Sequence, residues 1–441
     1  MSARGQFSSR LGFILAAAGS AVGLGNIWGF PTKVAENGGA AFVVMYLIMA
    51  FLLAYPVLMA ELIIGRAKQT NMIDALKKIS GNALGTVTGS IGAITVILIL
   101  SFYAIVAGWM ISYFIDATSS VFTLNIGWLT ADSTARSLVF MALFLVMTCL
   151  VVIGGVSNGI ERWSVRLMPT LLFLIIALIV YVSTQDGAID GWKAFLVPDV
   201  SRVLDPDLMV DAMGQAFFSM SLGVGTMLVY GSYIQKHENL PKLGTSVALV
   251  DIGVAVLAGM LIIPAMYVAL NNGVAIFEND KLISGPTLIF QVLPSLFTSM
   301  GYIGSFVAFF FFALMVIAAL TSSISMLEVP VAYLVDNKGM RRRRATVYIT
   351  LLVFVLSSII VFNFGALFGL VITVTTEYSQ PLLGLALCIF AGWVWKRDDI
   401  LSELKQGSPE IESGLFWKIW PYYVKFICPA AIAFMFYRSV L

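Results

Sequence analysis

Charged side chains are scarce in this chain of 441 residues. Only 11% are Asp, Glu, Lys or Arg, whereas 59% are hydrophobic, and the mean hydropathy is +0.94. Soluble globular domains carry about 25% charged residues, so the composition excludes a protein of that class. The net charge of +2 and the lack of a long basic tract give no reason to expect binding to nucleic acid.

Histidine and cysteine are nearly absent, and with them the usual ligands of a metal centre. The one histidine, His237, lies in a charged segment, and Cys149, Cys388 and Cys428 fall within apolar runs, where we expect buried free thiols. An intramembrane hydrolase would need a base or metal ligands beside a nucleophilic serine. No run shows the polar stripe of a channel. We therefore do not expect an enzyme or a channel.

Long apolar runs, in contrast, are abundant. A helix of about 20 apolar residues crosses the hydrocarbon core of a bilayer. Such runs lie near residues 11–33, 40–65, 86–115, 136–154, 164–183, 212–234, 245–271, 303–334, 345–362, 364–395 and 416–438. The sequence predicts an all-α polytopic membrane protein with eleven transmembrane helices and with its termini on opposite sides of the bilayer.

Lysine and arginine gather in alternate connections, beginning with Arg4 and including the run Arg341–Arg344. By the positive-inside rule these connections, and with them the N-terminus, are cytoplasmic. No cleavable signal precedes the first span. The connections over 184–211 and 272–302 then lie outside, and their length suits lids over an outer vestibule.

The first span is interrupted by the sequence GSAVGLGNIWGFP, residues 19–31. Glycine weakens a helix and lets other groups approach the backbone. A broken helix in hydrocarbon is tolerated only where protein, ligand or ion satisfies its free amides and carbonyls. The interruption is therefore a candidate binding site, although small residues also serve close helix packing.

The sixth span repeats this anomaly with GQAFFSMSLGVG, residues 214–225. Interrupted helices at matching positions of two halves indicate an inverted-repeat transporter with its site near the midplane. Close packing explains one interruption but explains a matched pair less well. We divide the chain into a first repeat over 1–183, an extracellular connection over 184–211, a second repeat over 212–395, and a final loop and span over 396–441.

These motifs resemble those of the neurotransmitter:sodium symporter family. The similarity extends to ENGG at 36–39, to Glu61 with Gly65-Arg66, and to LTSSIS at 320–325, and it runs from about Arg10 to the tenth span. It implies a LeuT-type fold and sodium-coupled import of a substrate by alternating access. The eleven-span length resembles the bacterial branch, which implies a bacterial inner membrane location.

The resemblance implies a first sodium site built from the carbonyl of Ala21, the side chain of Asn26, Ser219 and an oxygen of the seventh span. One alignment places Asp251 there, and another places Val250. We prefer Asp251, because a carboxylate inside a membrane needs a cation. A solvated Asp251 near the cytoplasmic end stays open as the alternative.

A second sodium site is implied at Gly19, Val22, Ala318, Thr321 and Ser322, all of which match the family pattern. Sodium is a hard cation that binds several oxygen ligands, which carbonyls and hydroxyls supply. The commoner role of hydroxyl side chains in membrane helices is a bond to the carbonyl one turn before. For Thr321 and Ser322, sodium binding and a hydrogen bond within the helix both stay open.

Chloride-dependent members of the family hold chloride beside the first sodium with Tyr, Gln, Ser and Asn side chains. Tyr46 and Gln215 match that pattern, but Ala255 stands at the serine position. A fixed negative charge at Asp251 could take the place of chloride. We therefore predict chloride-independent transport.

For the substrate, the amides of Leu24 and Gly25 open a half-helix whose N-terminus attracts a carboxylate, and Tyr103 matches the family's carboxylate-binding tyrosine. Gly23 stands where monoamine carriers have an aspartate, which points to an α-amino acid. The amine would meet Ala21, Phe218, Ser219 and Ser221, and the side-chain pocket would be Ser20, Ile99, Val224, Ser322 and Met326. This pocket favours neutral apolar or sulfur-containing amino acids.

The outer gate differs from the one that is usual in the family. Gly29 replaces the usual arginine, and the matching stretch 367–376 of the tenth span contains no acid, so that Glu377 is the first. We expect the outer gate to close through apolar and aromatic side chains, with Phe218 resembling the aromatic lid. The contacts expected are Tyr103, Phe218 and Trp28.

At the cytoplasmic side, Arg4 and Asp336 match the family's inner ion pair, with Tyr233 close by. Two carboxylates inside spans are functional candidates by default. We expect Glu61 to accept free amides of the broken helices, and Glu328 has no assigned role. A rival interpretation is a proton-coupled amino acid carrier of the same fold, in which Asp251 or Glu61 titrates in place of sodium binding.

Overall fold

The computed structural model describes the chain except for residues 1–4, 125, 199–204, 279–280, 284 and 441. The α-helices are α1 (Arg10–Ala21), α2 (Phe30–Glu36), α3 (Ala40–Met49), α4 (Tyr55–Lys68), α5 (Met72–Ser80), α6 (Ala83–Val121), α7 (Thr134–Ile153), α8 (Arg162–Ser183), α9 (Ala188–Leu196), α10 (Pro206–Ser219), α11 (Thr226–Gly231), α12 (Leu240–Asn271), α13 (Gly285–Thr287), α14 (Leu293–Ser299), α15 (Gly301–Lys338), α16 (Arg342–Phe362), α17 (Phe364–Ile372), α18 (Gln380–Ile389), α19 (Arg397–Lys405), α20 (Leu415–Tyr422) and α21 (Cys428–Val440).

Shorter helical segments join several of these helices. One is a 3-10 turn, η3 (Gly127–Leu129). The others are π-helical: η1 (Gly25–Gly29), η2 (Ala50–Ala54), η4 (Val156–Glu161), η6 (Leu288–Val292), η7 (Thr373–Ser379), η8 (Phe390–Val394) and η9 (Tyr423–Ile427). A small antiparallel hairpin, β1 (Phe277–Glu278) with β2 (Lys281–Leu282), is added to the helical fold that the sequence predicts.

Among the described residues, eight helices are long and apolar enough to cross a membrane, and two bent pairs raise the number to ten. One pair is the first span, Arg10–Ala21 and Gly25–Glu36, which meet at 53°. In the other, Phe364–Val394 turns by 97° into α19, which is therefore a separate helix. The broken pair α10 and α11 supplies one further candidate, so the architecture is consistent with the predicted eleven spans.

Two helices begin before the predicted spans because polar residues cap their first turns. The sixth span begins at Pro206, ahead of the predicted 212, because the Asp205 side chain accepts the Asp207 N–H and proline occupies the first turn. The third span, α6, begins at Ala83 after the cap Asn82. The length of an apolar run therefore does not predict where a helix with a polar first turn begins.

Both predicted interruptions are present. In the first span the helical backbone ends at Val22, with φ −67° and ψ 103°. In the sixth, Ser221 has φ +52°, and Gly223 and Gly225 have φ +86° and +81°. Glycine adopts positive φ without steric cost, which explains two of these positions. Each break frees carbonyls and amides inside the membrane protein.

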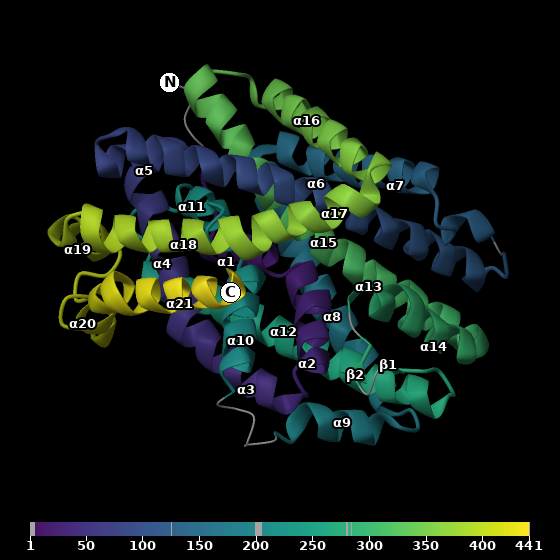
Figure 1. The fold of residues 1–441 in the computed structure, drawn as a ribbon. Coiled ribbons are helices and arrows are strands. Elements are labelled where there is room, and N and C mark those ends of the chain that lie inside the picture. The colour runs from purple at the N-terminus through teal and green to yellow at the C-terminus, as the bar shows by residue number, and fades with distance from the viewer. Residues whose placement is uncertain (1–4, 125, 199–204, 279–280, 284, 441) are drawn as a thin grey trace.

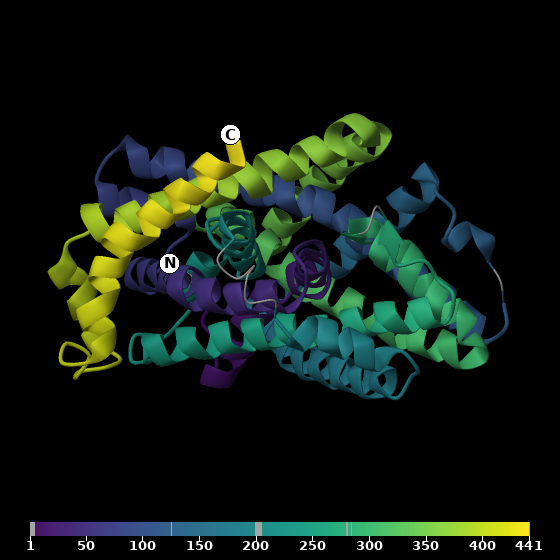
Figure 2. The same cartoon turned by 60° about the horizontal axis from the view of Figure 1, so that its bottom comes forward.

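The broken helices lie in the middle of the molecule, as Figures 1 and 2 show for α1, α2 and α10. α1 packs against α8, α12 and α15, α10 against α3, and α11 against α4. The neighbouring α18 and α21 run side by side, seen in yellow-green and yellow in Figure 1. The longer helices thus hold the unwound segments from several directions.

Candidate functional site

A cluster of oxygen atoms lies where the first break meets the sixth and seventh spans. Asn26 Nδ2 is 2.9 Å from Ser219 Oγ and 2.7 Å from Asp251 Oδ1. Ser219 Oγ donates to Asp251 Oδ2 at 2.9 Å and lies 3.2 Å from Tyr46 Oη. All four side chains are fully buried. Asp251 rather than the half-buried Val250 therefore faces this cluster, away from solvent.

The cluster provides hard oxygen ligands and one full negative charge. Asp251 has no basic side chain beside it among the contacts of the described residues, and its partners are an amide and a hydroxyl. An ionised carboxylate buried in this way is costly unless a cation neutralises it. A single carboxylate with neutral oxygens suits a monovalent cation such as Na⁺.

A second group of oxygens surrounds the C-terminal end of α1. Ser322 Oγ, from α15, lies 3.4 Å from the Gly19 carbonyl oxygen and 3.1 Å from that of Val22. Thr321 Oγ1 donates to the Ala318 carbonyl at 3.0 Å. Thr321 thus makes a bond within its own helix, whereas Ser322 reaches across to the broken first span. The five residues predicted for the second sodium site lie together.

Two cavities meet at the centre of the protein. The inner one, about 30 Å³, is lined by Ala21, Gly23, Leu24, Gly25, Ile99, Tyr103, Phe218, Ser221, Val224, Ser322, Met326 and Gln380. The outer one, about 650 Å³, shares Leu24, Tyr103 and Phe218 with it. These three side chains therefore separate the inner cavity from the outer vestibule, in the position expected of a lid.

The inner cavity has a polar end at the first break. The Leu24 N–H donates to Tyr103 Oη at 3.3 Å, a long bond between two groups predicted to bind a carboxylate. A Cβ at Gly23 would collide with Ser322 Oγ and would lie 2.9 Å from Tyr103 Oη. The glycine therefore leaves the space that an acidic side chain would fill.

All the predicted substrate residues line the inner cavity except two. Ser20 is buried and donates instead to Ser325 Oγ at 2.6 Å, and Ser219 belongs to the cluster of Asp251. The cavity adds one residue that the sequence analysis missed, Gln380. Its signal in the sequence is an amide side chain within the apolar tenth span.

Glu61 supports the second break. It is fully buried, and its carboxylate accepts the Gly223 N–H at 2.7 Å and the Leu228 N–H at 3.2 Å. Both amides belong to the unwound stretch and the first turn of α11. This arrangement corresponds to the acceptor role expected for Glu61.

The outer vestibule is lined by Trp28, Gly29, Lys33, Asp211 and Glu377 among others. Lys33 Nζ lies 3.3 Å from Asp211 Oδ1, so an ion pair joins α2 to α10 at the vestibule wall. The sequence analysis missed Lys33, which stands one helical turn beyond Gly29. Trp28 packs edge-on against Phe290 of the external connection, with ring centroids 6.4 Å apart.

At the end of the molecule predicted to be cytoplasmic, Tyr233 Oη donates to Glu328 Oε1 at 2.6 Å, and Arg342 Nη1 lies 3.0 Å from the same oxygen. This gives Glu328 a partner that the sequence analysis did not assign. Asp336 accepts the Asn71 N–H at 3.0 Å. Arg4, predicted to pair with Asp336, lies outside the described residues.

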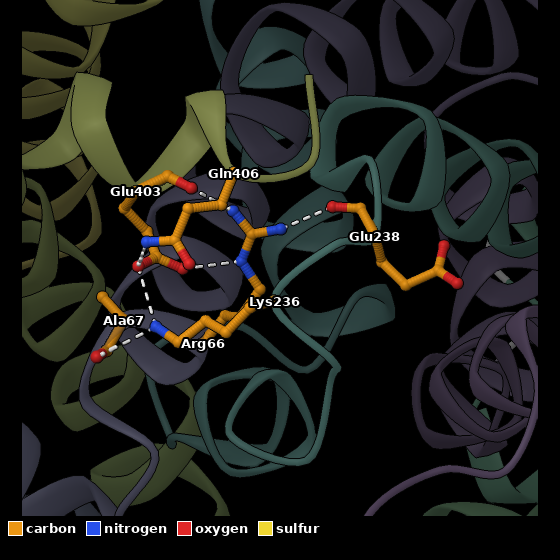
Figure 3. A network of polar contacts seen from close by, with 6 residues as sticks. All are labelled: Arg66, Ala67, Lys236, Glu238, Glu403 and Gln406. Carbon is orange, nitrogen blue, oxygen red and sulfur yellow. Dashed lines mark hydrogen bonds and ion pairs between the residues drawn. The ribbon is translucent and has the colours of Figure 1, made fainter. Parts of the chain in front are cut away.

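A buried polar network ties α4 to α19 near the same end (Figure 3). Arg66, fully buried, donates to Glu403 Oε1 at 2.7 Å and to the Glu403 carbonyl at 2.6 Å. It also donates to the Glu238 carbonyl at 2.5 Å. Lys236 Nζ binds Glu403 Oε2 at 2.8 Å and the Ala67 carbonyl at 3.3 Å. The GR motif at 65–66 therefore has a structural partner in α19.

Comparisons with known proteins agree with this architecture. The profile of the Sodium:neurotransmitter symporter family matches residues 4–139 and 132–441. An uncharacterized sodium-dependent transporter of Bacillus subtilis, YhdH, is 35% identical over 99% of this chain and 97% of its own. A second uncharacterized sodium-dependent transporter, from Haemophilus influenzae, is 32% identical over 99% of this chain and 98% of its own.

Among solved structures, the crystal structure of MhsT in complex with L-phenylalanine is similar, with a TM-score of 0.86 and 36% sequence identity. The similarity covers 99% of this chain and 100% of that chain. The protein has the LeuT-type fold and is a sodium-dependent transporter, not an enzyme. From its motifs, its broken spans and these relatives together, the chain belongs to the Sodium:neurotransmitter symporter family.

Proposed function

We propose that this protein imports a neutral amino acid together with sodium by alternating access, independently of chloride. We place it in a bacterial inner membrane with its N-terminus in the cytoplasm, in line with its basic connections. The observation that carries this proposal is the buried cluster of Asp251, Asn26 and Ser219 next to a cavity with a carboxylate-binding end. The relative MhsT was solved with an amino acid, which supports this substrate class.

The α-carboxylate of the substrate binds at the N-terminal end of η1. There it takes the Leu24 N–H and the Tyr103 hydroxyl, whose mutual bond of 3.3 Å it replaces. A helix N-terminus favours a negative charge. Because Gly23 brings no acid of its own, the substrate supplies the carboxylate. The free carbonyls at the two breaks and the Ser221 hydroxyl bind the amine.

The first sodium ion binds within the Asp251 cluster. Turning the Asn26 side-chain amide replaces its NH₂ group, now 2.7 Å from Asp251 Oδ1, by its oxygen. The ion then has oxygen ligands from Asn26, Ser219, Asp251 and the Ala21 carbonyl. The negative charge of Asp251 serves here in place of chloride, and Ala255 offers no hydroxyl to hold an anion.

The second sodium ion couples binding to conformation. Its ligands come from the end of α1 and from α15, so the ion joins the broken first span to a long helix. We expect this joint to stabilise the outward-open form. Substrate binding then brings the first and sixth spans together and permits closure below the vestibule.

Uptake by purified protein in proteoliposomes tests this function. A panel of labelled neutral amino acids is offered while inward sodium, potassium, proton and chloride gradients are varied independently. We expect uptake that requires inward sodium and survives replacement of chloride by gluconate. Uptake driven by protons without sodium would contradict the sodium sites and support proton coupling through Asp251 or Glu61.

A further inference from the structure

Gln380 lines the inner cavity but has no part in the proposed sodium sites or in carboxylate and amine binding. It is the first residue of α18 and directly follows the π-helical η7. The residue is 2% exposed. π-Helical turns inside longer helices occur frequently at functional sites. Gln380 is the one amide side chain among the described residues that line this cavity.

The hydrogen bonds of Gln380 fix the orientation of its amide. Its Nε2 lies 3.4 Å from the carbonyl oxygen of Phe217, at the end of α10. A carbonyl only accepts hydrogen bonds, so the nitrogen must face it and the oxygen must face the other way. That oxygen, Oε1, is buried and has no hydrogen-bond partner in the part of the chain that the structure describes.

A buried acceptor without a donor is unfavourable, and more so far from bulk water. The unwound stretch of the sixth span lies against this part of α18. A Cβ at Gly223 would come within 3.0 Å of the Gly384 nitrogen and closer still to the Gln380 carbonyl. Val224, the next residue along, belongs to the predicted side-chain pocket. Gln380 therefore adjoins the part of the cavity where the substrate's side chain is expected.

We propose that Gln380 determines specificity by accepting a hydrogen bond from the substrate's side chain. This inference rests on the proposed function and narrows it to neutral amino acids whose side chain carries a hydroxyl or N–H donor. It departs from the apolar or sulfur-containing side chains that the sequence analysis expects. Such a substrate supplies the partner that Oε1 lacks. An apolar side chain of the same shape leaves Oε1 unpaired, which sites built around a hydrogen bond penalise strongly.

Matched substrate pairs measure this preference. Threonine is compared with valine, and tyrosine with phenylalanine, as kcat/KM for sodium-driven uptake into proteoliposomes. We expect the wild-type protein to favour the donor-bearing member of the pair that it carries by about tenfold or more. In Gln380→Leu, which keeps the size of the side chain without its amide, the ratio should fall by about tenfold. The control is Gln291→Leu, an identical change at an exposed glutamine of the external connection, which should keep the wild-type ratio.

The apolar member of each pair reports whether a variant is folded, because its uptake needs no acceptor. Gln380→Met serves as a second variant should Gln380→Leu not fold. An equal loss of kcat/KM for both members of a pair in Gln380→Leu would contradict the inference. Oε1 would then bind the amine, which all these substrates share. Sodium-driven uptake without donor preference in the wild-type protein would overturn the inference and leave the proposed function standing. A lack of sodium-driven uptake for every amino acid would overturn both.

Discussion

At the residue scale, the proposed ion chemistry depends on Asp251. Its carboxylate is fully buried between Asn26 and Ser219, with 2.7 and 2.9 Å bonds to them. Neither partner carries a positive charge. We therefore propose that a mobile cation neutralises the carboxylate and that its own charge takes the place of a separate anion.

The substitution Asp251→Asn tests this role. It keeps the size of the side chain but removes its charge and replaces one acceptor oxygen by a donor NH₂ group. We expect the sodium concentration for half-maximal uptake to rise by about tenfold or more, since hydrogen bonds and ion contacts of buried charges contribute about 1.5–3 kcal/mol. Uptake in the variant should gain a dependence on chloride.

The control for this test is Asp186→Asn, at an exposed position of an external connection. It should leave both the sodium and the chloride dependence unchanged. Unaltered sodium dependence in Asp251→Asn would remove Asp251 from the ion site.

Gly23 has the same importance for the substrate. Its missing side chain leaves room beside Ser322 and Tyr103, and a Cβ would lie 2.9 Å from the tyrosine hydroxyl. We expect Gly23→Ala to reduce kcat/KM for amino acid uptake by at least about tenfold, because a 1 Å displacement of binding groups costs up to about 10²-fold. Uptake of a labelled substrate measures the loss.

Gly253→Ala is the matched control, because a Cβ there meets nothing within 4 Å and the residue lies in the middle of α12. Alanine is the better helix former, so this variant should be as stable as the parent or more so. Full uptake by Gly23→Ala would show that the carboxylate binds elsewhere.

At the scale of elements, each broken span needs partners for the amides that the break frees. Glu61 of α4 supplies them for the sixth span by accepting from Gly223 and Leu228. A break of this kind in hydrocarbon is stable only with such acceptors. Through Glu61, α4 thereby holds the unwound stretch of the sixth span that lines the inner cavity.

We expect Glu61→Gln to destabilise the protein by about 1–3 kcal/mol, because one side-chain oxygen becomes a donor and leaves an amide unpaired. Thermal unfolding of the purified protein in detergent measures this loss as a lower melting temperature. Glu410→Gln, an exposed position near α19, provides the control and should melt like the wild type. Equal melting temperatures for both variants would mean that Glu61 is not needed to hold the break.

The outer side contains an ion pair in addition to the aromatic and apolar contacts expected from the sequence. Tyr103 and Phe218 do separate the two cavities, as the aromatic gate predicts. In addition, Lys33 pairs with Asp211 at 3.3 Å, which links α2 and α10. Both helices belong to the broken spans, so this pair can keep them together while they move.

At the scale of the whole molecule, buried ion pairs join helices at the end predicted to be cytoplasmic. Arg66 makes three hydrogen bonds to Glu403 and to the Glu238 carbonyl, which ties α4 to α19 (Figure 3). Separately, Glu328 and Arg342 join α15 to α16. Arg66 and Glu403 lie 337 residues apart in the sequence, whereas α15 and α16 are consecutive helices.

The Arg66–Glu403 pair can be measured by a double-mutant cycle. Removing one partner of a buried ion pair costs about 3–5 kcal/mol, because the other charge stays buried without a counter-charge. We expect Arg66→Met and Glu403→Gln each to lower the melting temperature strongly. Together they should lower it much less than the sum of the single effects. Additive effects would show that the two side chains do not stabilise each other.

The sequence predicted the molecule well where local pattern decides the outcome. Long apolar runs located the spans, and glycine clusters at 19–31 and 214–225 located both breaks, because glycine at mid-membrane has few other uses. The resemblance of the motifs to the family predicted which residues belong to the two proposed sodium sites. The capped starts at Pro206 and Ala83 were missed, since polar first turns carry no hydropathy signal.

Thus the sequence by itself determined the membrane class, the broken spans and the family, because hydropathy, glycine placement and motifs are properties of neighbouring residues. Only the tertiary structure decided the pairings between distant helices. In that structure Asp251 contacts Asn26, and Ser20 donates to Ser325 and does not line the inner cavity. Gln380 does line this cavity. The physical reason is that a side chain's burial and partners depend on which helices pack around it, and no single span encodes that packing.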